Sequence, residues 1–360
     1  MRNLLEVRGL TVELPTPAGW VRPVNDVSLH IAAGESLGLV GESGSGKTML
    51  ALALMGLLPP GARVSGRALL AGHSMEASAG GAPRVPGQAS PVPAASSDAR
   101  RSGKDLTTLS ECEWRDVRGR EIAMVFQEPM TSLNPVMRIG AQIEEAIRAH
   151  ESSLSAGEVR RGTIEALRRA AVPEPEVRAE QFPHQLSGGL RQRAMIAMAL
   201  AGGSGGQNGG PSAGPRLLIA DEPTTALDVT VQKQILELLD GLRKEMRLGL
   251  LFITHDLGVV AHVADRVAVL YAGRVVEEGP TQEVLRTPRH PYTQGLLVAS
   301  PRLERGALTP IPGAVPQLSA LPPGCAFEPR CALRRAECSQ DVPNLRAAAP
   351  NHSARCVLVD

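Results

Sequence analysis

Apolar and polar residues alternate in two segments near the N-terminus, at 4–14 ("LLEVRGLTVEL") and at 24–31 ("VNDVSLHI"). Because successive side chains of a strand point to opposite faces, this alternation predicts two antiparallel strands with one buried face. Three later segments, at 36–40, 217–220 and 249–253, are short and almost entirely apolar. Such runs are typical of fully buried strands. The pattern therefore predicts half-buried strands near the N-terminus and fully buried strands from residue 36 onward.

Helical patterns lie between the buried strands. Residues 48–58 ("TMLALALMGLL") have helical length, and residues 229–245 place apolar side chains at helical spacing. At 266–279, two apolar runs flank an Ala-Gly pair, which predicts a hairpin. Strands that alternate with helices in this way indicate an α/β fold.

Two segments differ in composition from the rest of the chain. Residues 72–103 contain no Leu, Ile or aromatic residue and are rich in Ala, Ser, Gly and Pro. They cannot bury enough apolar surface to offset the entropy of ordering, so we expect a disordered insertion. Residues 202–215 are a shorter insertion of the same kind. From 281 onward the pattern becomes irregular, which predicts a main domain at 1–280 and a small domain at 281–360.

Charge and the lack of targeting signals argue against several classes of protein. The 38 basic residues balance 37 acidic ones, which leaves no basic surface for nucleic acid. The N-terminus has neither the apolar core nor the cleavage site of a signal peptide. The most apolar helical run breaks at Pro59, short of the roughly 18 residues that a membrane span needs. We therefore expect a cytosolic chain that does not itself cross a membrane.

The segment 41–48, "GESGSGKT", matches the phosphate-binding loop G-x-x-x-x-G-K-[ST] between a predicted strand and a predicted helix. Glycines let backbone N–H groups surround a phosphate chain. Lys47 reaches the β- and γ-phosphates, and Thr48 offers its hydroxyl to Mg²⁺. The residues expected to bind the nucleotide are Gly41, Ser43, Gly44, Ser45, Gly46, Lys47 and Thr48.

A second part of a nucleotide site is predicted where the apolar strand "LLIADE" ends in two acids. Asp221 is expected to hold the Mg²⁺ shell. Glu222, one residue later, is placed to polarise an attacking water. The two segments together predict an ATP site.

The segment "LSGGLRQR" places Ser187, Gly188 and Gly189 at the start of a predicted helix, where N–H groups form an anion site. It resembles the LSGGQ signature of the ABC ATPases, with Leu190 in place of the Gln. The order of this motif relative to the phosphate-binding loop makes the resemblance specific.

Three further motifs follow the order of the same family. Gln127 in "VFQEP" resembles the Q-loop glutamine, residues 225–228 ("TALD") resemble the D-loop, and His255 in "FITHD" resembles the switch histidine. The resemblance implies an ABC-type nucleotide-binding domain whose sheet has a parallel core. It also implies an antiparallel β subdomain, a helical subdomain at about 128–215, and a small irregular Cys-rich C-terminal domain.

The resemblance implies a mechanism as well. Two such domains face each other head to tail, and each ATP lies between one domain's phosphate-binding loop and the other domain's signature. In this chain Lys47 would bind phosphate, and Glu222 would be the general base. Gln127 would bind Mg²⁺ and sense the membrane subunit, and His255 would contact the γ-phosphate. The signature serine and glycines would act across the interface.

The contact with adenine departs from the family pattern. The family stacks adenine on an aromatic residue near the first strands, whereas the matching position here is Leu14. Trp20 lies close by in the sequence and is a candidate substitute.

Three segments resemble the oligopeptide/dipeptide branch of the ABC importers, at 119–147, at 289–297 ("RHPYTQGLL") and at 321–331 ("LPPGCAFEPRC"). The resemblance implies partners: a second ATPase subunit, identical or homologous, two membrane permeases, and an extracytoplasmic binding protein that acts through the permeases. The chain would lie on the cytoplasmic face of the membrane as a peripheral subunit.

Several functions remain open at this stage. Related importers carry dipeptides, oligopeptides, glutathione or nickel complexes, and the residues of this subunit do not choose among them. A catalytically silent partner subunit is an alternative, which Lys47, Glu222 and His255 argue against. A third alternative is a soluble ABC ATPase that acts on DNA or ribosomes. Such proteins carry long coiled coils or two fused ATPase units, and this sequence shows neither.

Four of the five cysteines lie near the C-terminus, at Cys325, Cys331, Cys338 and Cys356. In a reducing compartment, clustered cysteines are more often metal ligands than disulfides. Their spacing is not the C-x₂-C of common zinc sites, but four thiolates are what a [4Fe–4S] cluster requires. The family resemblance points to iron–sulfur, while Zn²⁺ and unligated thiols stay open. Cys112 is expected to be a spectator.

Overall fold

The computed structural model describes residues 3–17, 19–72, 103–202, 214–225, 227–300 and 310–359. Almost all of the predicted insertions at 72–103 and 202–215 lies outside this range. None of the described helices is long and apolar enough to cross a membrane.

Within the described residues the strands form two sheets. The smaller sheet has the order β2-β1-β4-β5 and consists of β1 (Asn3–Thr16), β2 (Gly19–Ala32), β4 (Arg63–Leu70) and β5 (Lys104–Asp105). The larger sheet has the order β11-β12-β10-β9-β3-β8-β7-β6. Its strands are β3 (Ser36–Val40), β6 (Ile122–Val125), β7 (Leu217–Asp221), β8 (Gly249–Thr254), β9 (Arg266–Tyr271), β10 (Arg274–Pro280), β11 (Arg346–Ala349) and β12 (His352–Ala354).

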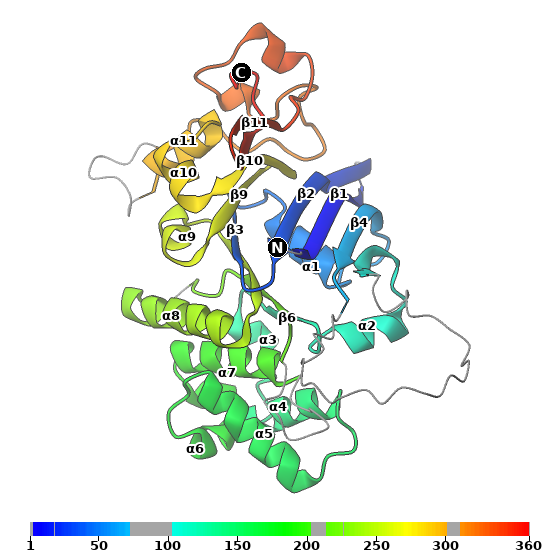
Figure 1. Ribbon diagram of the computed structural model, residues 1–360, viewed down its shortest axis with the longest axis vertical. Coiled ribbons are helices and arrows are strands. Elements are labelled where there is room, and N and C mark those ends of the chain that lie inside the picture. Colours follow the sequence, from blue (N-terminus) through cyan, green and yellow to red (C-terminus); the bar gives the residue numbers. More distant parts are fainter. Residues whose placement is uncertain are drawn as a thin grey trace, which may run out of the picture.

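Helices cover the larger sheet and form a separate group at one end of the molecule, shown in green in Figure 1. That group contains α3 (Pro129–Ser132), α4 (Ile139–Arg148), α5 (Ala156–Arg169), α6 (Pro175–Ala179) and α7 (Gly188–Ala201). The remaining helices are α1 (Lys47–Leu54), α2 (Glu111–Val117), α8 (Val229–Met246), α9 (Leu257–Val263), α10 (Thr281–Arg286) and α11 (Pro291–Val298). Apolar side chains of α4, α5 and α7 share one buried cluster with α8.

The centre of the larger sheet is parallel, as the buried apolar runs and the family resemblance led us to expect. β3 pairs in parallel with β8 and β9, and β7 pairs in parallel with β8 and β6. Every residue of β3, β7 and β8 is buried. Because parallel strands present their carboxyl ends at one edge, the loops after β3, β7 and β8 come together there.

The two antiparallel predictions are also confirmed. β1 and β2 form a long antiparallel pair, and β9 pairs with β10 through a tight turn at Ala272 and Gly273. Both turn residues have positive φ, 46° and 82°. Two successive left-handed residues suit the right-handed twist of a hairpin.

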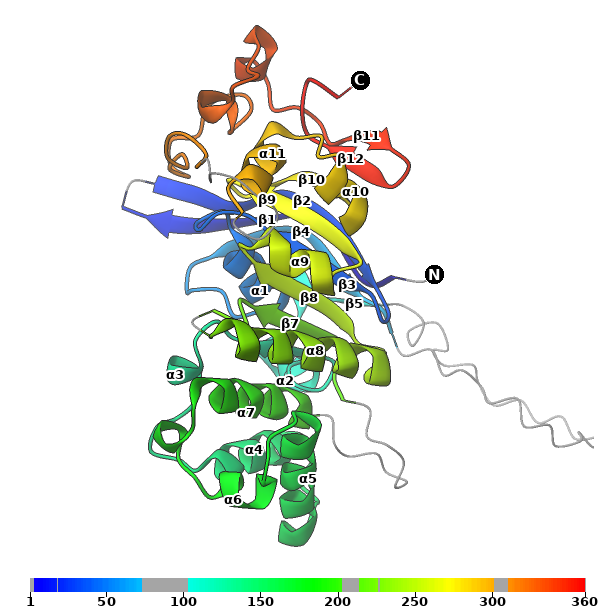
Figure 2. The same ribbon diagram turned by 90° about the vertical axis from the view of Figure 1, so that its left-hand side faces the viewer.

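The C-terminal part differs from the predicted separate, irregular domain. β11 and β12 form a hairpin, and β12 pairs antiparallel with β10, so residues 346–354 extend the larger sheet (Figure 2). Sequence pattern misses these strands because they are short and consist mainly of Ala, Ser and Arg. Glu277 and Glu278 on β10 supply the pairing partners.

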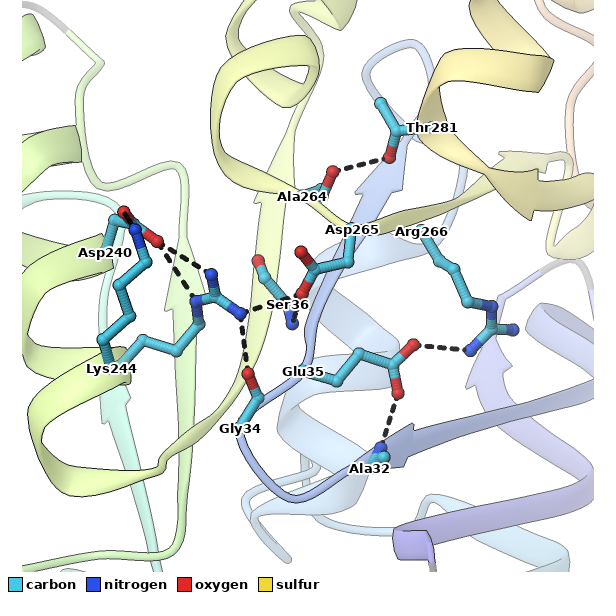
Figure 3. A network of polar contacts seen from close by, with 11 residues as sticks. Ala32, Gly34, Glu35, Ser36, Asp240, Lys244, Ala264, Asp265, Arg266 and Thr281 are labelled. Atoms are coloured by element: carbon cyan, nitrogen blue, oxygen red, sulfur yellow. Dashed lines mark hydrogen bonds and ion pairs between the residues drawn. The ribbon is translucent and has the colours of Figure 1, made fainter. Parts of the chain in front are cut away.

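A polar network anchors β3 at its start (Figure 3). The Asp265 carboxylate accepts hydrogen bonds from the Ser36 backbone N–H at 2.9 Å and from Arg243 at 2.8 Å. Arg243, near the end of α8, also donates to the Gly34 carbonyl at 2.6 Å. These contacts fix β3 against α8 and β9, and the loop at the other end of β3 is the phosphate-binding loop.

Candidate ATP site

The loop from Gly41 to Gly46 joins β3 to α1 and wraps around the start of the helix. Gly46 has φ of 104°, and a Cβ there would clash with the Pro23 carbonyl. The Gly273 N–H, in the turn between β9 and β10, donates to the Ser45 carbonyl at 2.9 Å. The loop is therefore held from two sides by backbone.

Lys47 begins α1 and points back into the loop. Its ammonium donates to the carbonyls of Gly41 at 2.7 Å and Glu42 at 3.0 Å. Burial lowers the pKa of Lys47, and the acidic side chains of Glu222, Asp221 and Glu42 act in the opposite direction. The structure thus keeps a buried cation in the position where a phosphate chain is expected.

Asp221 is the last residue of β7 and is almost fully buried. Burial raises the pKa of Asp221, and a hydrogen bond from the Thr48 hydroxyl acts in the opposite direction. Its Oδ1 atom has no hydrogen-bond partner among the described residues. A buried carboxylate oxygen without a partner, next to a hydroxyl, is the donor set that Mg²⁺ prefers, so these residues fit the ion.

Glu222 lies at the centre of a polar cluster just after β7. Its backbone is left-handed, with φ of 45°, and its carboxylate accepts hydrogen bonds from Gln127 at 3.1 Å and Thr225 at 2.9 Å. His255, in the loop after β8, contacts the same carboxylate through Nδ1 at 3.3 Å. The contact with His255 lowers the pKa of Glu222 and raises the pKa of His255. The structure therefore brings together three residues whose sequence positions are far apart.

The signature residues lie elsewhere, at the start of α7. Ser187 caps the helix by accepting a hydrogen bond from the Leu190 N–H, and Ser187 and Gly188 are exposed. A Cβ at Gly189 would press against Val231 of α8. The start of α7 is thus close to α8 and open to solvent.

The two residues named for adenine stacking lie on opposite faces of the smaller sheet. Leu14 pairs with Val21 and packs against the core, whereas Trp20 pairs with Pro15 on the other face. Trp20 is 45% exposed, and the Arg63 guanidinium lies 3.9 Å from its ring centroid. Trp20 is therefore not placed to substitute for an aromatic residue at Leu14.

The four C-terminal cysteines line one small cavity, together with His290. None of them forms a disulfide. Backbone N–H groups approach the sulfurs: the Arg335 N–H lies 3.4 Å from Cys338 Sγ, and the Leu358 N–H lies 3.5 Å from Cys356 Sγ. No group of three or more His, Cys, Asp or Glu side chains within the described ranges could hold a metal ion.

Sequence reasoning did not identify two buried residues near these sites. His290 is fully buried, and its Nε2 has no hydrogen-bond partner in the described part of the chain. Arg330 reaches Glu42 in the phosphate-binding loop. His290 lies within the quoted "RHPYTQGLL" segment, but only the fold shows what surrounds it.

Comparison with known families agrees with this geometry. The ABC transporter family matches residues 24–225, and the C-terminal region of oligopeptide/dipeptide transporters matches residues 276–338. A peptide import ATP-binding protein of Brucella ovis is 46% identical, over 98% of this chain and 96% of the relative. A peptide import ATP-binding protein of Brucella abortus is 44% identical, over 98% of this chain and 94% of the relative.

Solved structures give the same result. The dimeric ATP-binding cassette MJ0796, bound to ADP and Pi after hydrolysis, superposes with a TM-score of 0.58 at 25% identity, and the match covers 77% of this chain and 98% of MJ0796. The protein cbiO1 of Clostridium perfringens, part of the transporter complex cbiONQ, gives 0.57 at 25% identity, covering 80% and 92%. The chain therefore belongs to the ABC transporter ATPases, in the branch that carries the oligopeptide/dipeptide transporter C-terminal region.

Proposed function

We propose that this chain is the ATP-hydrolysing subunit of an importer for peptides. The observation that carries the proposal is the cluster of Gln127, His255 and Glu222 beside Asp221 and Lys47. This arrangement supports the assignment of Glu222 as general base, Lys47 as the cation for phosphate and Asp221 as the carboxylate for Mg²⁺. The names of the Brucella relatives support peptide as the substrate class.

Each side chain has a defined task in this proposal. Lys47 and the N–H groups of Gly41 to Thr48 bind the phosphate chain of ATP, and Thr48, Asp221 and Gln127 hold Mg²⁺. The bound ion neutralises charge that develops on the phosphate oxygens. Glu222 accepts a proton from the attacking water, and His255 orients that carboxylate and meets the γ-phosphate.

The exposed start of α7 supports a two-chain site. Ser187, Gly188 and Gly189 present a helix N-terminus to solvent, which suits phosphate from a neighbouring subunit. We infer that a second ATPase, identical or homologous, completes each site. Two permeases would anchor the pair at the cytoplasmic face of the membrane, and a separate binding protein would deliver the substrate to them.

The chain divides functionally at residue 280 in this proposal. Residues 1–280 form the ATPase unit, with its helical part at about 128–215, and residues 281–360 form the C-terminal region. Transport assays on the assembled complex with labelled oligopeptide, glutathione and a nickel complex test the substrate class. Uptake of oligopeptide is the expected result, and uptake of only one of the other two would replace peptide as the substrate.

Glu222→Gln tests the catalytic assignment, because the amide keeps the shape of the side chain and removes the base. We expect ATP binding to persist and hydrolysis by the assembled complex to fall by about 10²-fold or more. Glu237→Gln, an exposed change on α8, is the matched control and should hydrolyse ATP normally. Near-normal turnover by the Glu222 variant, with the partner's site inactivated, would exclude Glu222 as the base.

We further propose that the four C-terminal cysteines hold a [4Fe–4S] cluster. Burial raises the pKa of Cys325, Cys331 and Cys356, and neighbouring cysteines raise it further, so the thiols lie within electrostatic reach of one another. Ligation by metal ions is what keeps such buried thiols deprotonated. Backbone N–H groups near the sulfurs suit cysteinate ligands.

A [4Fe–4S] cluster and a single zinc ion differ in how closely they bring the four sulfurs together. Zn²⁺ would draw four sulfurs to about 3.8 Å from one another, given Zn–S bonds of about 2.3 Å. The four cysteines line one cavity, although no group of three or more ligand side chains in the described residues is placed to hold a metal ion, so the preference for iron–sulfur comes from the family resemblance. His290 lines that cavity, and its Nδ1 already accepts a hydrogen bond from the Tyr292 N–H, so its unpartnered Nε2–H is free to donate to a bound cluster.

Metal content tests this second proposal. Anaerobically purified protein should be brown, absorb near about 400 nm and contain about four irons per chain. Cys331→Ser should lose the absorbance, while Cys112→Ser, an exposed control, should retain it. Colourless protein with one zinc per chain, or with four titratable thiols, would exclude the cluster.

A further inference from the structure

Arg330 connects the cysteine-rich segment to the phosphate-binding loop. It lies in the short turn Glu328–Arg330, directly before Cys331, and its side chain is 5% exposed. Its guanidinium contacts both oxygens of Glu42, with Nη1 at 2.7 Å from Oε2 and Nη2 at 3.0 Å from Oε1. This is the bidentate geometry in which arginine binds a carboxylate most strongly.

Other groups fix the guanidinium in this position. Its Nε donates to the Pro312 carbonyl at 2.9 Å, and Nη1 lies 3.3 Å from the Tyr271 hydroxyl. Arg330 is therefore held by the C-terminal segment and by β9 before it reaches the loop. A side chain held at several points loses little further entropy when it binds Glu42.

Glu42 is the second residue of the phosphate-binding loop and is held at three separate places. Arg330 binds its carboxylate, the Tyr292 hydroxyl accepts a hydrogen bond from its N–H at 2.8 Å, and Lys47 donates to its carbonyl at 3.0 Å. Two of these three contacts come from the C-terminal region. The carboxylate is also close enough to affect the pKa of Lys47.

We propose that Arg330 is a positioning residue of the ATP site, through which the C-terminal region sets the affinity for ATP. It acts in two ways: it keeps the loop backbone in the shape that receives phosphate, and it neutralises the Glu42 carboxylate beside the phosphate position. Without Arg330, Glu42 would place an uncompensated negative charge near the triphosphate. ATP binding should weaken, while the chemical step, which uses Glu222, changes little.

The position of Arg330 in the chain links this effect to the cysteines. Cys331 follows Arg330 directly, and Cys325 lies five residues before it. Whatever fixes these two thiols also fixes the turn that carries the guanidinium.

ATP affinity of the full chain tests the inference, measured by calorimetry with Mg²⁺-ATP. Arg330→Ala should raise the Kd by about tenfold, the effect of losing one charged hydrogen bond. The double variant Glu42→Gln/Arg330→Ala should recover most of that loss, because it removes the carboxylate that Arg330 neutralises. Arg334→Ala removes an exposed arginine of the same segment that pairs with Glu328, and should bind ATP like the parent chain.

A merely structural role makes a different prediction. If Arg330 served only to fold the C-terminal segment, the double variant would bind ATP no better than Arg330→Ala, and this result would overturn the inference. So would an Arg330→Ala chain whose Kd stays within about twofold of the parent. Arg330→Lys keeps the positive charge but cannot contact both oxygens of Glu42 at once, so its Kd for ATP should lie between those of the parent and Arg330→Ala. If the alanine variant does not fold, the lysine variant can be compared with the parent chain instead.

The inference rests on the proposed ATP site, and the two can fail separately. In the assembled complex, Arg330→Ala should raise the KM for ATP and leave kcat within about twofold. Failure of the parent chain to bind ATP would refute the proposed function. Normal binding by both the parent and Arg330→Ala would refute only the role of Arg330.

Discussion

Glu277 of β10 is fully buried and connects this strand to two segments of the C-terminal region, at 289–290 and at 352. Its Oε1 accepts hydrogen bonds from the Arg289 N–H at 2.7 Å and from His352 Nε2 at 2.8 Å. Its Oε2 accepts one from the His290 N–H at 2.9 Å. His290 and His352 are each 1% exposed, so water cannot replace Glu277 as the partner of these two residues.

Glu277→Gln should destabilise the protein by about 3–5 kcal/mol. The amide has nearly the same shape, but one of its two ends is an NH₂ group, and donors occupy both carboxylate oxygens in the parent chain. At least one buried donor therefore faces another donor, which costs about 1–3 kcal/mol. The remaining bonds lose their charged acceptor, and since a hydrogen bond to a charged group contributes about 1.5–3 kcal/mol, the total loss is about 3–5 kcal/mol.

Urea unfolding followed by far-UV circular dichroism measures this change. With an m-value of several kcal/mol per molar for a chain of this size, the midpoint should fall by roughly 1 M. Glu283→Gln, an exposed change on neighbouring α10, is the control and should stay within about 0.5 kcal/mol of the parent. A Glu277→Gln chain less than about 1 kcal/mol weaker than the parent would refute the reasoning, because three bonds to a buried carboxylate would then contribute little.

Three further predictions concern the ATP site. Gly46→Ala should lower ATP affinity by about tenfold or more in a calorimetric titration, because its φ of 104° and a nearby backbone carbonyl leave no room for a Cβ. Glu222→Gln should lower the pKa of His255, measured by NMR titration of the imidazole. The parent's His255–Glu222 pair gives its full stabilisation below the ordinary histidine pKa and above the ordinary glutamate pKa. That stabilisation is lost as pH rises through the raised pKa of His255 or falls through the lowered pKa of Glu222, and an unchanged His255 pKa in the variant would contradict the contact. Leu14→Phe should tighten ATP binding by stacking on adenine, whereas Trp20→Ala should leave the Kd within about twofold, since Trp20 lies on the other face.

Local sequence pattern predicted the elements that surround the candidate ATP site. The apolar runs at β3, β7 and β8 correspond to strands buried on both faces, and a run of that kind leaves few alternatives for its structure. The glycines around Lys47 require a loop between strand and helix. The order of these motifs, compared with a known family, was enough to assign Gln127, Glu222 and His255 to one nucleotide site, whereas their mutual contacts come from the structure.

The same pattern did not predict contacts that depend on pairing between distant strands. Trp20 was considered beside Leu14 because the two are close in sequence, yet the strand register places them on opposite faces. The hairpin of β11 and β12 has few apolar residues, so its strand character comes from hydrogen bonds to β10. The order of apolar and polar residues along the chain shows neither which strands pair with each other nor the register in which they pair.

The contact between Arg330 and Glu42 is the extreme case, since 288 positions separate the two residues. Each is an ordinary charged residue in its own segment, and surface arginines and glutamates of that kind usually contribute little. Burial changes their importance, because a guanidinium held by Pro312 and Tyr271 cannot leave the carboxylate without leaving a charge unpaired. This contact connects the region that matches the C-terminal part of oligopeptide/dipeptide transporters to the loop between β3 and α1, and it is the basis for the proposed effect of Arg330 on ATP affinity.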